Sequence, residues 1–344
     1  MAEHFVQINV TAPRAGRLTY NAPGEASIEN IQLTEIKEEN VLLKTLYSGI
    51  SRGTESLVYH GRVPKSEWKR MQCPFMSGNF SFPVSYGYAC VCEIIDKGAS
   101  VNGLEKGDRV FVLHPHQDLF QVPSEHCNLL SEAIPTARGV LAANMETALN
   151  AIWDAEISNE ASCAVIGAGV VGLSTAHALR EVAGLSPVII DVNPTKEKIA
   201  SSMGFHFETG TERTDSDSKA EYDLIFHTSA SAAGLQSAVE LAGFEAKIIE
   251  MSWYGEKPVT LSLGGKFHSS RLKIISSQVG TIAPAKRHQF SYSQRMQKAI
   301  ALLDDPRLDN LLEKPIGFHN LPNHLHDIFN PQSDVLCQLI EYTE

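Results

Sequence analysis

The sequence predicts an α/β protein that joins a β-rich region to a doubly wound parallel sheet. Three observations predict this fold class. Short strands separated by Gly/Pro turns occupy residues 1 to about 140. From residue 161 onward, short apolar strands alternate with amphipathic helices. A glycine-rich loop, Gly167-Ala168-Gly169-Val170-Val171-Gly172, lies between the first of those strands and the helix that follows it.

Composition narrows the class of protein. The chain has 344 residues, enough for two domains, and a formal net charge of −11, which argues against nucleic-acid binding. Its apolar runs are shorter than the roughly 18 residues of a membrane span, so we expect no membrane partner. The six cysteines form no CxxC pair, and the N-terminus reads as a strand rather than an export signal. Both features predict a cytoplasmic protein.

The β-rich region contains runs with strand character and two distinctive loops. A polar loop over residues 48–55 follows one of these strands, and a Gly/Ser/Phe-rich stretch over 75–83 reads as irregular. The segment His114-Pro115-His116-Gln117 follows another strand. The strands are predicted over residues 5–10, 41–47, 87–95 and 110–113.

The second region follows a linking helix over residues 141–155. Gly184 is expected to cap the helix that the glycine-rich loop opens, and Asn193 with Pro194 is expected to begin the next one. The polar stretch 208–220 reads as an exposed loop. Strands are predicted over 163–166, 187–191, 224–227, 247–251, 272–276 and 335–342, and helices over 170–183, 195–203 and 234–241, with a further helix ending near 303.

The glycine-rich loop has the pattern that binds a dinucleotide. Gly167 permits a tight turn, Gly169 lets the backbone approach a pyrophosphate, and Gly172 lets the helix pack on the strand. The helix N-terminus at Val170 and Val171 offers free N–H groups and the positive end of the helix dipole. Asp191 ends the second strand and is expected to bind the adenosine ribose, which favours NAD over NADP. A glycine-rich turn in some other α/β unit is the alternative.

Beyond this loop, the chain resembles the medium-chain dehydrogenases/reductases, the family of zinc-type alcohol dehydrogenases. The resemblance covers nearly the whole chain and rests on the segments 47–55, 86–89 and 107–110. It implies a GroES-like catalytic domain formed by residues 1–150 and 278–344. It also implies a Rossmann NAD-binding domain over 151–277, and assembly into a homodimer or homotetramer.

The chain departs from this family at the zinc ligands. Ser51 stands where the family has a zinc-binding cysteine, and Tyr88 and Ala89 stand where it has a histidine and a glutamate. Ala143 lies near the third ligand position, and the lobe that holds a structural zinc is missing. The chain therefore looks similar to a subgroup without the usual ligands, near the bacteriochlorophyllide dehydrogenase branch. We expect no catalytic zinc.

The resemblance also implies catalytic residues. His114 falls at a position that lines the substrate pocket, where a histidine could move the proton, and a structural histidine is the alternative. Tyr88 could donate a hydrogen bond to the substrate oxygen or fill the vacated zinc cavity. Thr54 matches a proton-relay hydroxyl, with a loop-capping threonine as the alternative. Another hypothesis places a new metal site at His114 and His116 with Glu55 or Glu146.

Further residues are implied on the cofactor side. Asn193 and Lys196 resemble, with Asp191, the ribose clamp of NAD-specific members. Arg52 matches a pyrophosphate-contacting position, with a solvated surface charge as the alternative. Thr147 matches a threonine against the nicotinamide, with a helix-facing core residue as the alternative. Ser229 follows the strand that ends at His227, so it is expected to face the crevice at the carboxyl ends of the strands.

Taken together, the sequence predicts an NAD(H)-dependent oxidoreductase that interconverts an alcohol and a carbonyl of a small-molecule substrate without zinc. The cofactor would carry the hydride. A zinc-free enoyl or quinone reductase is one alternative. A non-catalytic NAD-binding protein is another.

Overall fold

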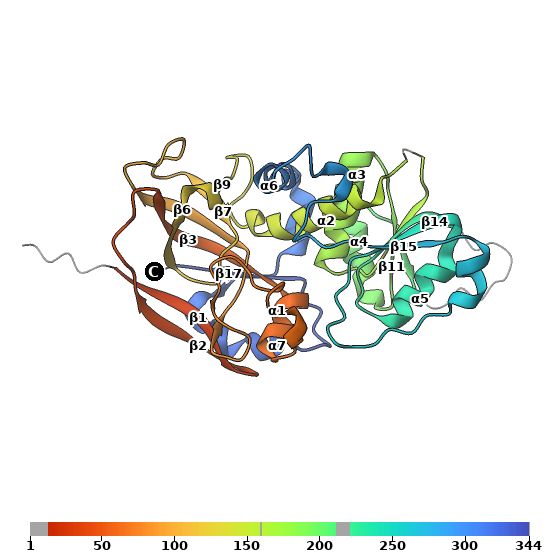
Figure 1. Ribbon diagram of the computed structural model, residues 1–344, viewed down its shortest axis with the longest axis horizontal. Helices are drawn as coiled ribbons and strands as arrows, with labels where there is room; N and C mark the ends of the chain where they lie inside the picture. The colour runs from red at the N-terminus through yellow and green to blue at the C-terminus, as the bar shows by residue number, and fades with distance from the viewer. Residues whose placement is uncertain (1–12, 159, 211–220, 344) are drawn as a thin grey trace, which may run out of the picture.

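The computed structural model describes residues 13–158, 160–210 and 221–343, which form two lobes side by side (Figure 1). One lobe is β-rich and combines the first part of the chain with its C-terminal part. The other holds a parallel sheet built from the middle of the chain. The strand predicted over 5–10 lies outside the described residues.

The β-rich lobe contains two sheets. The smaller has the order β2-β1-β5-β4, and the larger has the order β16-β17-β3-β6-β7-β9, with β8 also pairing with β3. The last strand of the chain, β17, lies between β16 and β3, so the C-terminal segment completes a sheet begun near the N-terminus. The strands are β1 (Arg14–Ala22), β2 (Glu25–Gln32), β3 (Asn40–Ser51), β4 (Ser77–Gly78), β5 (Val84–Ser85), β6 (Cys90–Lys97), β7 (Arg109–Val112), β8 (Leu119–Pro123), β9 (Asn128–Leu129), β16 (Ile316–Gly317) and β17 (Cys337–Glu341).

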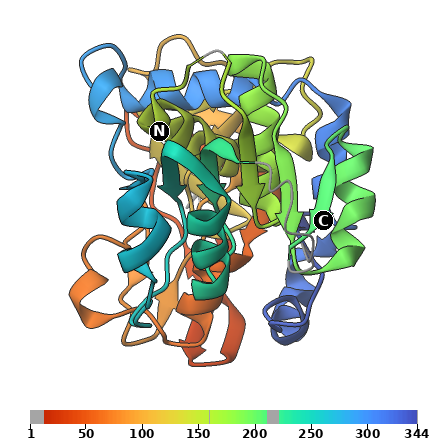
Figure 2. The same cartoon turned by 90° about the vertical axis from the view of Figure 1, so that its right-hand side faces the viewer.

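The other lobe is the doubly wound sheet that the sequence predicts, seen with this lobe toward the viewer in Figure 2. Its six parallel strands have the order β12-β11-β10-β13-β14-β15, so the chain begins in the middle and winds outward in both directions. Every residue of β10 is buried, as expected for a short apolar strand covered on both faces. The strands are β10 (Cys163–Ile166), β11 (Val188–Asp191), β12 (Phe207–Thr209), β13 (Tyr222–His227), β14 (Ala242–Glu250) and β15 (Lys273–Ser276).

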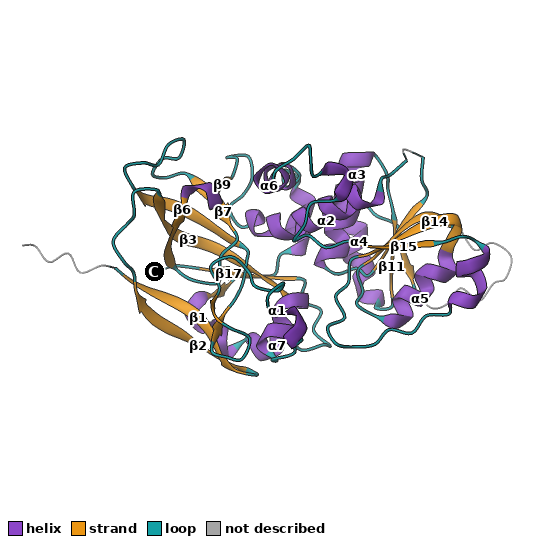
Figure 3. Ribbon diagram, in the orientation of Figure 1, coloured by secondary structure: helices purple, strands orange, loops and turns teal. Residues whose placement is uncertain are grey.

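Helices cover both faces of this sheet (Figure 3). Alternate residues of β10 separate the two cores: Val165 packs with Leu173 and Leu179 of α3, and Ala164 packs with Leu235 and Ala238 of α5. The first of these cores also includes α2, α6 and part of the β-rich lobe. The helices are α1 (Arg52–Tyr59), α2 (Ala142–Ala155), α3 (Val170–Ala183), α4 (Glu197–Ser202), α5 (Ala232–Leu241), α6 (Tyr292–Ala301) and α7 (Leu325–Ile328).

The stretch from residue 208 was expected to be a loop, but β12 continues to Thr209 and pairs with β11; residues 211–220 lie outside the described part. The expected domain boundary after residue 150 falls within the continuous helix α2. In the part of the chain that the structure describes, no helix combines the length and apolar character that crossing a membrane requires.

Candidate cofactor and active site

The glycine-rich loop turns the chain from β10 into α3 at the carboxyl edge of the sheet. Gly167 has φ of +110°, a conformation that side chains disfavour. A Cβ on Gly172 would collide with the carbonyl oxygen of Gly167, whereas a Cβ on Gly169 would meet nothing within 4 Å. The chain's own packing thus requires two of these glycines, and the open space beside Gly169 leaves room for a ligand against the backbone.

The first turn of α3 presents backbone donors to that space. Its N-cap residue, Gly169, has no side chain to accept from them, and the turn contains no acidic residue. Val170 and Val171 are only half-buried. The N–H groups and the positive end of the helix therefore remain available to an anion, and a pyrophosphate fits this donor set.

The carboxylate of Asp191 lies beside the same loop, at the end of β11. Its Oδ2 accepts a hydrogen bond from the Ala168 N–H at 2.6 Å, and its Oδ1 accepts from the Asn193 N–H at 2.8 Å. These bonds fix a negative charge next to the anion-binding turn. A ribose with free hydroxyls can donate to this carboxylate, whereas a ribose phosphate is repelled.

Asn193 and Lys196 both contact Asp334. The Asn193 amide donates to Asp334 Oδ1 at 2.7 Å, and the Lys196 ammonium donates to the Asp334 carbonyl oxygen at 2.8 Å. Lys196 Nζ also lies 3.6 Å from Asp334 Oδ1. Both side chains expected in a ribose clamp are thus engaged by a segment of the β-rich lobe.

Arg52 holds that same segment from the other side. Its guanidinium donates to the carbonyl oxygens of Asn330, Ser333 and Val335 at 2.9, 2.8 and 2.5 Å. We refer to residues 330–335 as the C-terminal strap. Arg52 was expected to contact a pyrophosphate. Its guanidinium donors are instead directed at backbone carbonyls of the strap, within the β-rich lobe.

Tyr88 lies where the resemblance places a zinc-binding histidine. Its hydroxyl hydrogen-bonds with the side chains of Ser51 and Thr54, so the three residues expected at this site lie together. Burial, followed by the negative charge of Glu55, raises the pKa of Tyr88 well above its ordinary value. The phenol therefore stays protonated and remains a hydrogen-bond donor at physiological pH.

Glu55, whose charge acts on Tyr88, forms a fully buried pair with His116. Glu55 Oε2 lies 2.9 Å from His116 Nε2, and Glu55 Oε1 accepts from the Ser51 N–H at 2.8 Å. His116 Nδ1 lies 2.8 Å from Ser48 Oγ, which in turn lies 2.9 Å from the Tyr342 hydroxyl. The sequence suggests Glu55 only as a possible metal ligand and does not predict its pairing with His116.

A catalytic zinc does not fit this donor set. Ser51 and Tyr88 offer hydroxyls in place of thiolate and imidazole. Both ring nitrogens of His116 and both oxygens of Glu55 already have protein partners. Glu146 is far from free, since its carboxylate forms a buried ion pair with Arg295 at 3.0 Å. The geometry thus also disfavours the alternative metal site at these residues.

The surroundings of His114 do not suit the proton carrier expected from the sequence. The ring stacks on Phe120 with centroids 3.6 Å apart, and Phe75 stacks nearby at 5.4 Å. Its Nδ1 lies 2.8 Å from the Pro115 carbonyl oxygen, so Nδ1 carries the hydrogen. Burial lowers the pKa of His114 to about 3, and the ring stays neutral near pH 7. These contacts favour a structural role.

Thr147 and Ser229 have local partners. The Thr147 hydroxyl donates to the Ala143 carbonyl oxygen at 3.0 Å, one turn earlier in α2. Ser229 lies just beyond the carboxyl end of β13, as expected, with Oγ 2.7 Å from His227 Nε2.

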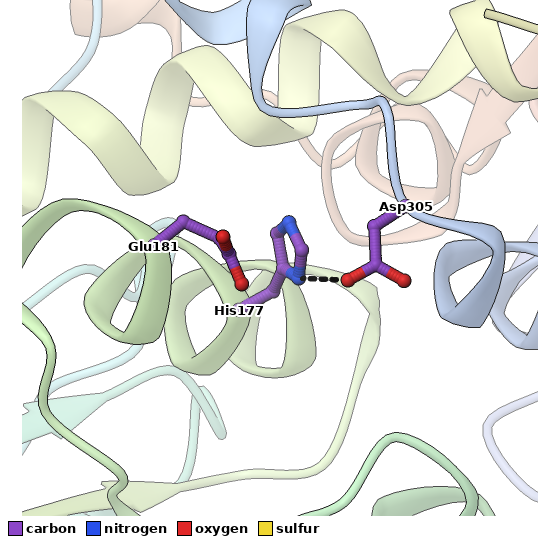
Figure 4. A group of neighbouring side chains, drawn as sticks. All are labelled: His177, Glu181 and Asp305. Carbon is purple, nitrogen blue, oxygen red and sulfur yellow. Dashed lines mark ion pairs between the residues drawn. The ribbon is translucent and has the colours of Figure 1, made fainter.

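Within the described ranges, one group of ligand-type side chains is close enough to hold a metal: His177, Glu181 and Asp305 (Figure 4). Arginines already occupy it. Arg180 donates to His177 Nδ1 at 3.1 Å, the other ring nitrogen lies 2.9 Å from a backbone carbonyl, and Arg307 binds Asp305 at 2.6 Å. Two guanidinium groups beside the carboxylates repel a cation, so this cluster is an ion-pair network that joins α3 to the chain after α6.

Solved structures share this fold over nearly the whole chain. A short chain alcohol dehydrogenase from E. coli CFT073, solved with NADH, has a TM-score of 0.77 at 17% identity and covers 96% of this chain and 99% of its own. TarJ from S. aureus, solved with NADPH, has a TM-score of 0.73 at 16% identity and covers 96% and 100%. The fold is that of the medium-chain dehydrogenases/reductases, with a GroES-like and a Rossmann domain.

Sequence comparison adds a more specific likeness. The chain is 25% identical over 280 residues to the 2-desacetyl-2-hydroxyethyl bacteriochlorophyllide A dehydrogenase of Cereibacter sphaeroides, covering 76% of this chain and 81% of that protein. No family model matches the chain. The resemblance to zinc-type alcohol dehydrogenase-like proteins, including a bacteriochlorophyllide dehydrogenase, is therefore confirmed.

Proposed function

We propose that this protein is an NAD(H)-dependent oxidoreductase that interconverts an alcohol and a carbonyl without catalytic zinc. The observation that carries the proposal is the uncapped first turn of α3, with open space at Gly169 and the Asp191 carboxylate beside it. That arrangement suits a pyrophosphate linked to an unphosphorylated ribose. The bacteriochlorophyllide relative and the E. coli neighbour are dehydrogenases, and the name of the former specifies a hydroxyethyl compound.

The preference for NAD over NADP rests on Asp191. Solved neighbours carry either NADH or NADPH, so the fold alone does not select a cofactor. Asp191 accepts bonds from Ala168 and Asn193 and keeps a negative charge at the ribose position. A 2′-phosphate would be repelled by that charge.

The proposed chemistry needs a hydrogen-bond donor at the substrate oxygen. The nicotinamide supplies or accepts the hydride when it is bound. The Tyr88 hydroxyl donates to the carbonyl or alcohol oxygen in place of a metal ion, and Thr54 and Ser51 orient that hydroxyl. Burial keeps Tyr88 protonated, and the charge of Glu55 adds to this effect because a second anion beside the carboxylate is unfavourable. Thr54 would pass the proton between Tyr88 and the cofactor side.

Metal analysis combined with cofactor titration tests this proposal. We expect less than about a tenth of a zinc per chain, tighter binding of NADH than NADPH, and alcohol oxidation that survives EDTA treatment. Stoichiometric zinc, or activity lost to EDTA and restored by zinc, would contradict the metal-free mechanism. Product analysis separates the alternatives, since an enoyl or quinone reductase reduces a conjugated double bond and leaves simple alcohols unchanged.

We also propose that the protein forms a homodimer or homotetramer and acts on a small molecule. Strand β15 is the last strand at one end of the parallel sheet, and two of its four residues are exposed. Such an edge offers backbone groups to a second copy. Light scattering on the purified protein gives the subunit number, and a monomer would contradict the proposal. The cytoplasmic location expected from the sequence stays a prediction.

A further inference from the structure

A polar chain lies at the carboxyl ends of two neighbouring strands. His227 ends β13, Glu250 ends β14, and the two are paired in register. His227 is fully buried, with Nδ1 2.8 Å from Glu250 Oε2 and Nε2 2.7 Å from Ser229 Oγ. Glu250 also accepts from the Ser252 N–H at 2.7 Å and from the Tyr254 hydroxyl at 3.0 Å.

With the His227 ring neutral and Glu250 ionised, the chemistry of these groups sets the direction of each hydrogen bond. An ionised carboxylate only accepts, so the hydrogen between Glu250 and His227 belongs to Nδ1. In a neutral imidazole the other nitrogen then accepts, and it takes the hydrogen of the Ser229 hydroxyl. With its hydrogen directed inward, the Ser229 oxygen has only lone pairs left for a ligand. Glu250 thus makes Ser229 an acceptor through His227.

The position of Ser229 relates this acceptor to one half of the cofactor. Sheet order places β13 and β14 on one side of β10, and β11 with Asp191 on the other. A dinucleotide lies across the carboxyl edge, so adenosine bound at Asp191 puts the nicotinamide nucleoside over β13 and β14. Ser229 is half-buried there, and a Cβ on Gly234 of α5 would collide with its Oγ, so the glycine makes room for the hydroxyl.

We propose that the Glu250–His227–Ser229 chain recognises the nicotinamide half of the cofactor, an inference that rests on the proposed function. Ser229 Oγ accepts a hydrogen bond from a donor on that half. The nicotinamide nucleoside carries two kinds of donor, the ribose hydroxyls and the carboxamide NH₂ group. Ser229 touches the ligand, whereas His227 and Glu250 act as positioning residues that set the direction of its hydrogen.

Calorimetric titration with NAD⁺ and with ADP tests the contact. ADP carries only the adenosine half, so Ser229→Ala should weaken NAD⁺ binding about tenfold and leave the ADP dissociation constant unchanged. Ser237→Ala is the matched control, because its hydroxyl donates within α5 to the Ala233 carbonyl oxygen. Titrating 3-acetylpyridine adenine dinucleotide, which lacks the carboxamide NH₂, identifies the donor. If the donor is a ribose hydroxyl, Ser229→Ala weakens binding of this analogue as it weakens binding of NAD⁺. If the donor is the carboxamide, Ser229→Ala leaves binding of the analogue unchanged.

Glu250→Gln tests the direction of the hydrogen bonds between Glu250, His227 and Ser229, because glutamine has nearly the same shape as glutamate. The glutamine amide can donate to His227 Nδ1, which moves the ring hydrogen to Nε2 and turns the Ser229 hydrogen outward. We expect weaker NAD⁺ binding in the otherwise native protein and no further loss in a Ser229→Ala background. A purely structural role would give the same loss in both backgrounds.

Three results would overturn the inference. One is NAD⁺ binding by Ser229→Ala within about twofold of the native protein. Another is an equal effect of Glu250→Gln in both backgrounds, measured on variants whose circular dichroism matches the native chain. Either of these results, obtained while the native protein binds NAD⁺, refutes the role of the Glu250–His227–Ser229 chain and leaves the proposed function standing. Native protein that binds neither NAD⁺ nor ADP refutes the proposed function and this inference together.

Discussion

At the scale of single residues, Asp191 has a clear consequence for cofactor choice. Its carboxylate is fixed beside the glycine-rich loop by the backbone N–H groups of Ala168 and Asn193. Asp191→Ala removes the acceptor for the ribose hydroxyls and the charge that repels a phosphate. We expect the ratio of NADPH to NADH dissociation constants to fall about tenfold or more. Fluorescence titration measures it, with exposed Asp304→Ala as the control. An unchanged ratio would refute this role.

Tyr88 is the second residue whose role can be isolated. Tyr88→Phe removes one hydroxyl and keeps the ring that fills the space beside Ser51 and Thr54. If Tyr88 donates to the substrate oxygen, kcat should fall about 10²-fold or more while NADH affinity is retained. Tyr86→Phe is a matched control, because that hydroxyl bonds the Met71 carbonyl oxygen. Full activity in Tyr88→Phe would mean that the ring only fills the space.

His114 predicts a pH effect on stability rather than on turnover. Its pKa is lowered to about 3 by burial, while an unfolded chain protonates histidine near pH 6.5. Protonation therefore favours unfolding, and this contribution to stability is present above about pH 6.5 and is lost as the pH falls toward 3. Between pH 6.5 and 5 the loss is about 2 kcal/mol.

His114→Phe tests this assignment because phenylalanine keeps the stacking on Phe120 and Phe75 and cannot titrate. Its free energy of unfolding, measured in urea at pH 7 and pH 5, should fall by less than that of the native protein. An equal fall in both proteins would place the titrating group elsewhere. Loss of turnover at pH 7 with stability intact would restore His114 as a catalytic residue.

At the scale of elements, the C-terminal strap connects the lobes. Arg52 holds it from the β-rich lobe, while Asn193 and Lys196 hold Asp334 from the sheet lobe. Asp334→Ala should release the Asn193 side chain and lower the NADH dissociation constant several-fold, while Lys196 keeps its bond to the backbone carbonyl oxygen of residue 334. The exposed ion pair itself is worth less than about 1 kcal/mol. Asp327→Ala, an exposed acid on α7, is the control. Weaker NADH binding in Asp334→Ala would mean that the strap supports the cofactor.

The sequence predicted those elements whose signal is local. Strand β10, the loop and α3 agree with expectation because apolar runs, three glycines and a Gly184 C-cap at φ +68° determine them within about twenty residues. Strand β12 was missed because its polar sequence gives no strand pattern, and its pairing with β11 decides its structure.

The candidate site was predictable only in part for the same reason. Ser51, Thr54 and Tyr88 meet as the resemblance implies. The Glu55–His116 pair joins residues 61 positions apart, and Asp334 meets Asn193 across 141. No spacing rule identifies such partners. The His227–Glu250 pair had a usable signal, since His227 ends one predicted parallel strand and Glu250 lies one residue before the end of another, which places both at one edge of the sheet.

At the scale of the whole molecule, the two lobes share one core. The cluster that contains Leu173 and Leu179 of α3 also contains Val91 and Phe111 of the β-rich lobe, with α2 between them. We therefore expect one cooperative unfolding transition in calorimetry, with the calorimetric and van't Hoff enthalpies equal. Added NADH should shift that transition upward as a unit. Two resolved transitions, of which NADH shifts only one, would contradict this coupling.

The place of β17 within the larger sheet also affects how the protein is made. Ser48 and Tyr342 lie 294 residues apart in the chain yet hydrogen-bond at 2.9 Å, and β17 lies between β3 and β16. At ordinary rates of translation the ribosome adds the residues between them in about 15 to 60 s. All six strands of the parallel sheet have been synthesised by Ser276, whereas the part of β3 that pairs with β17 lacks that neighbour until synthesis ends. The newly made β-rich lobe is therefore the part of the chain that most needs protection by a chaperone.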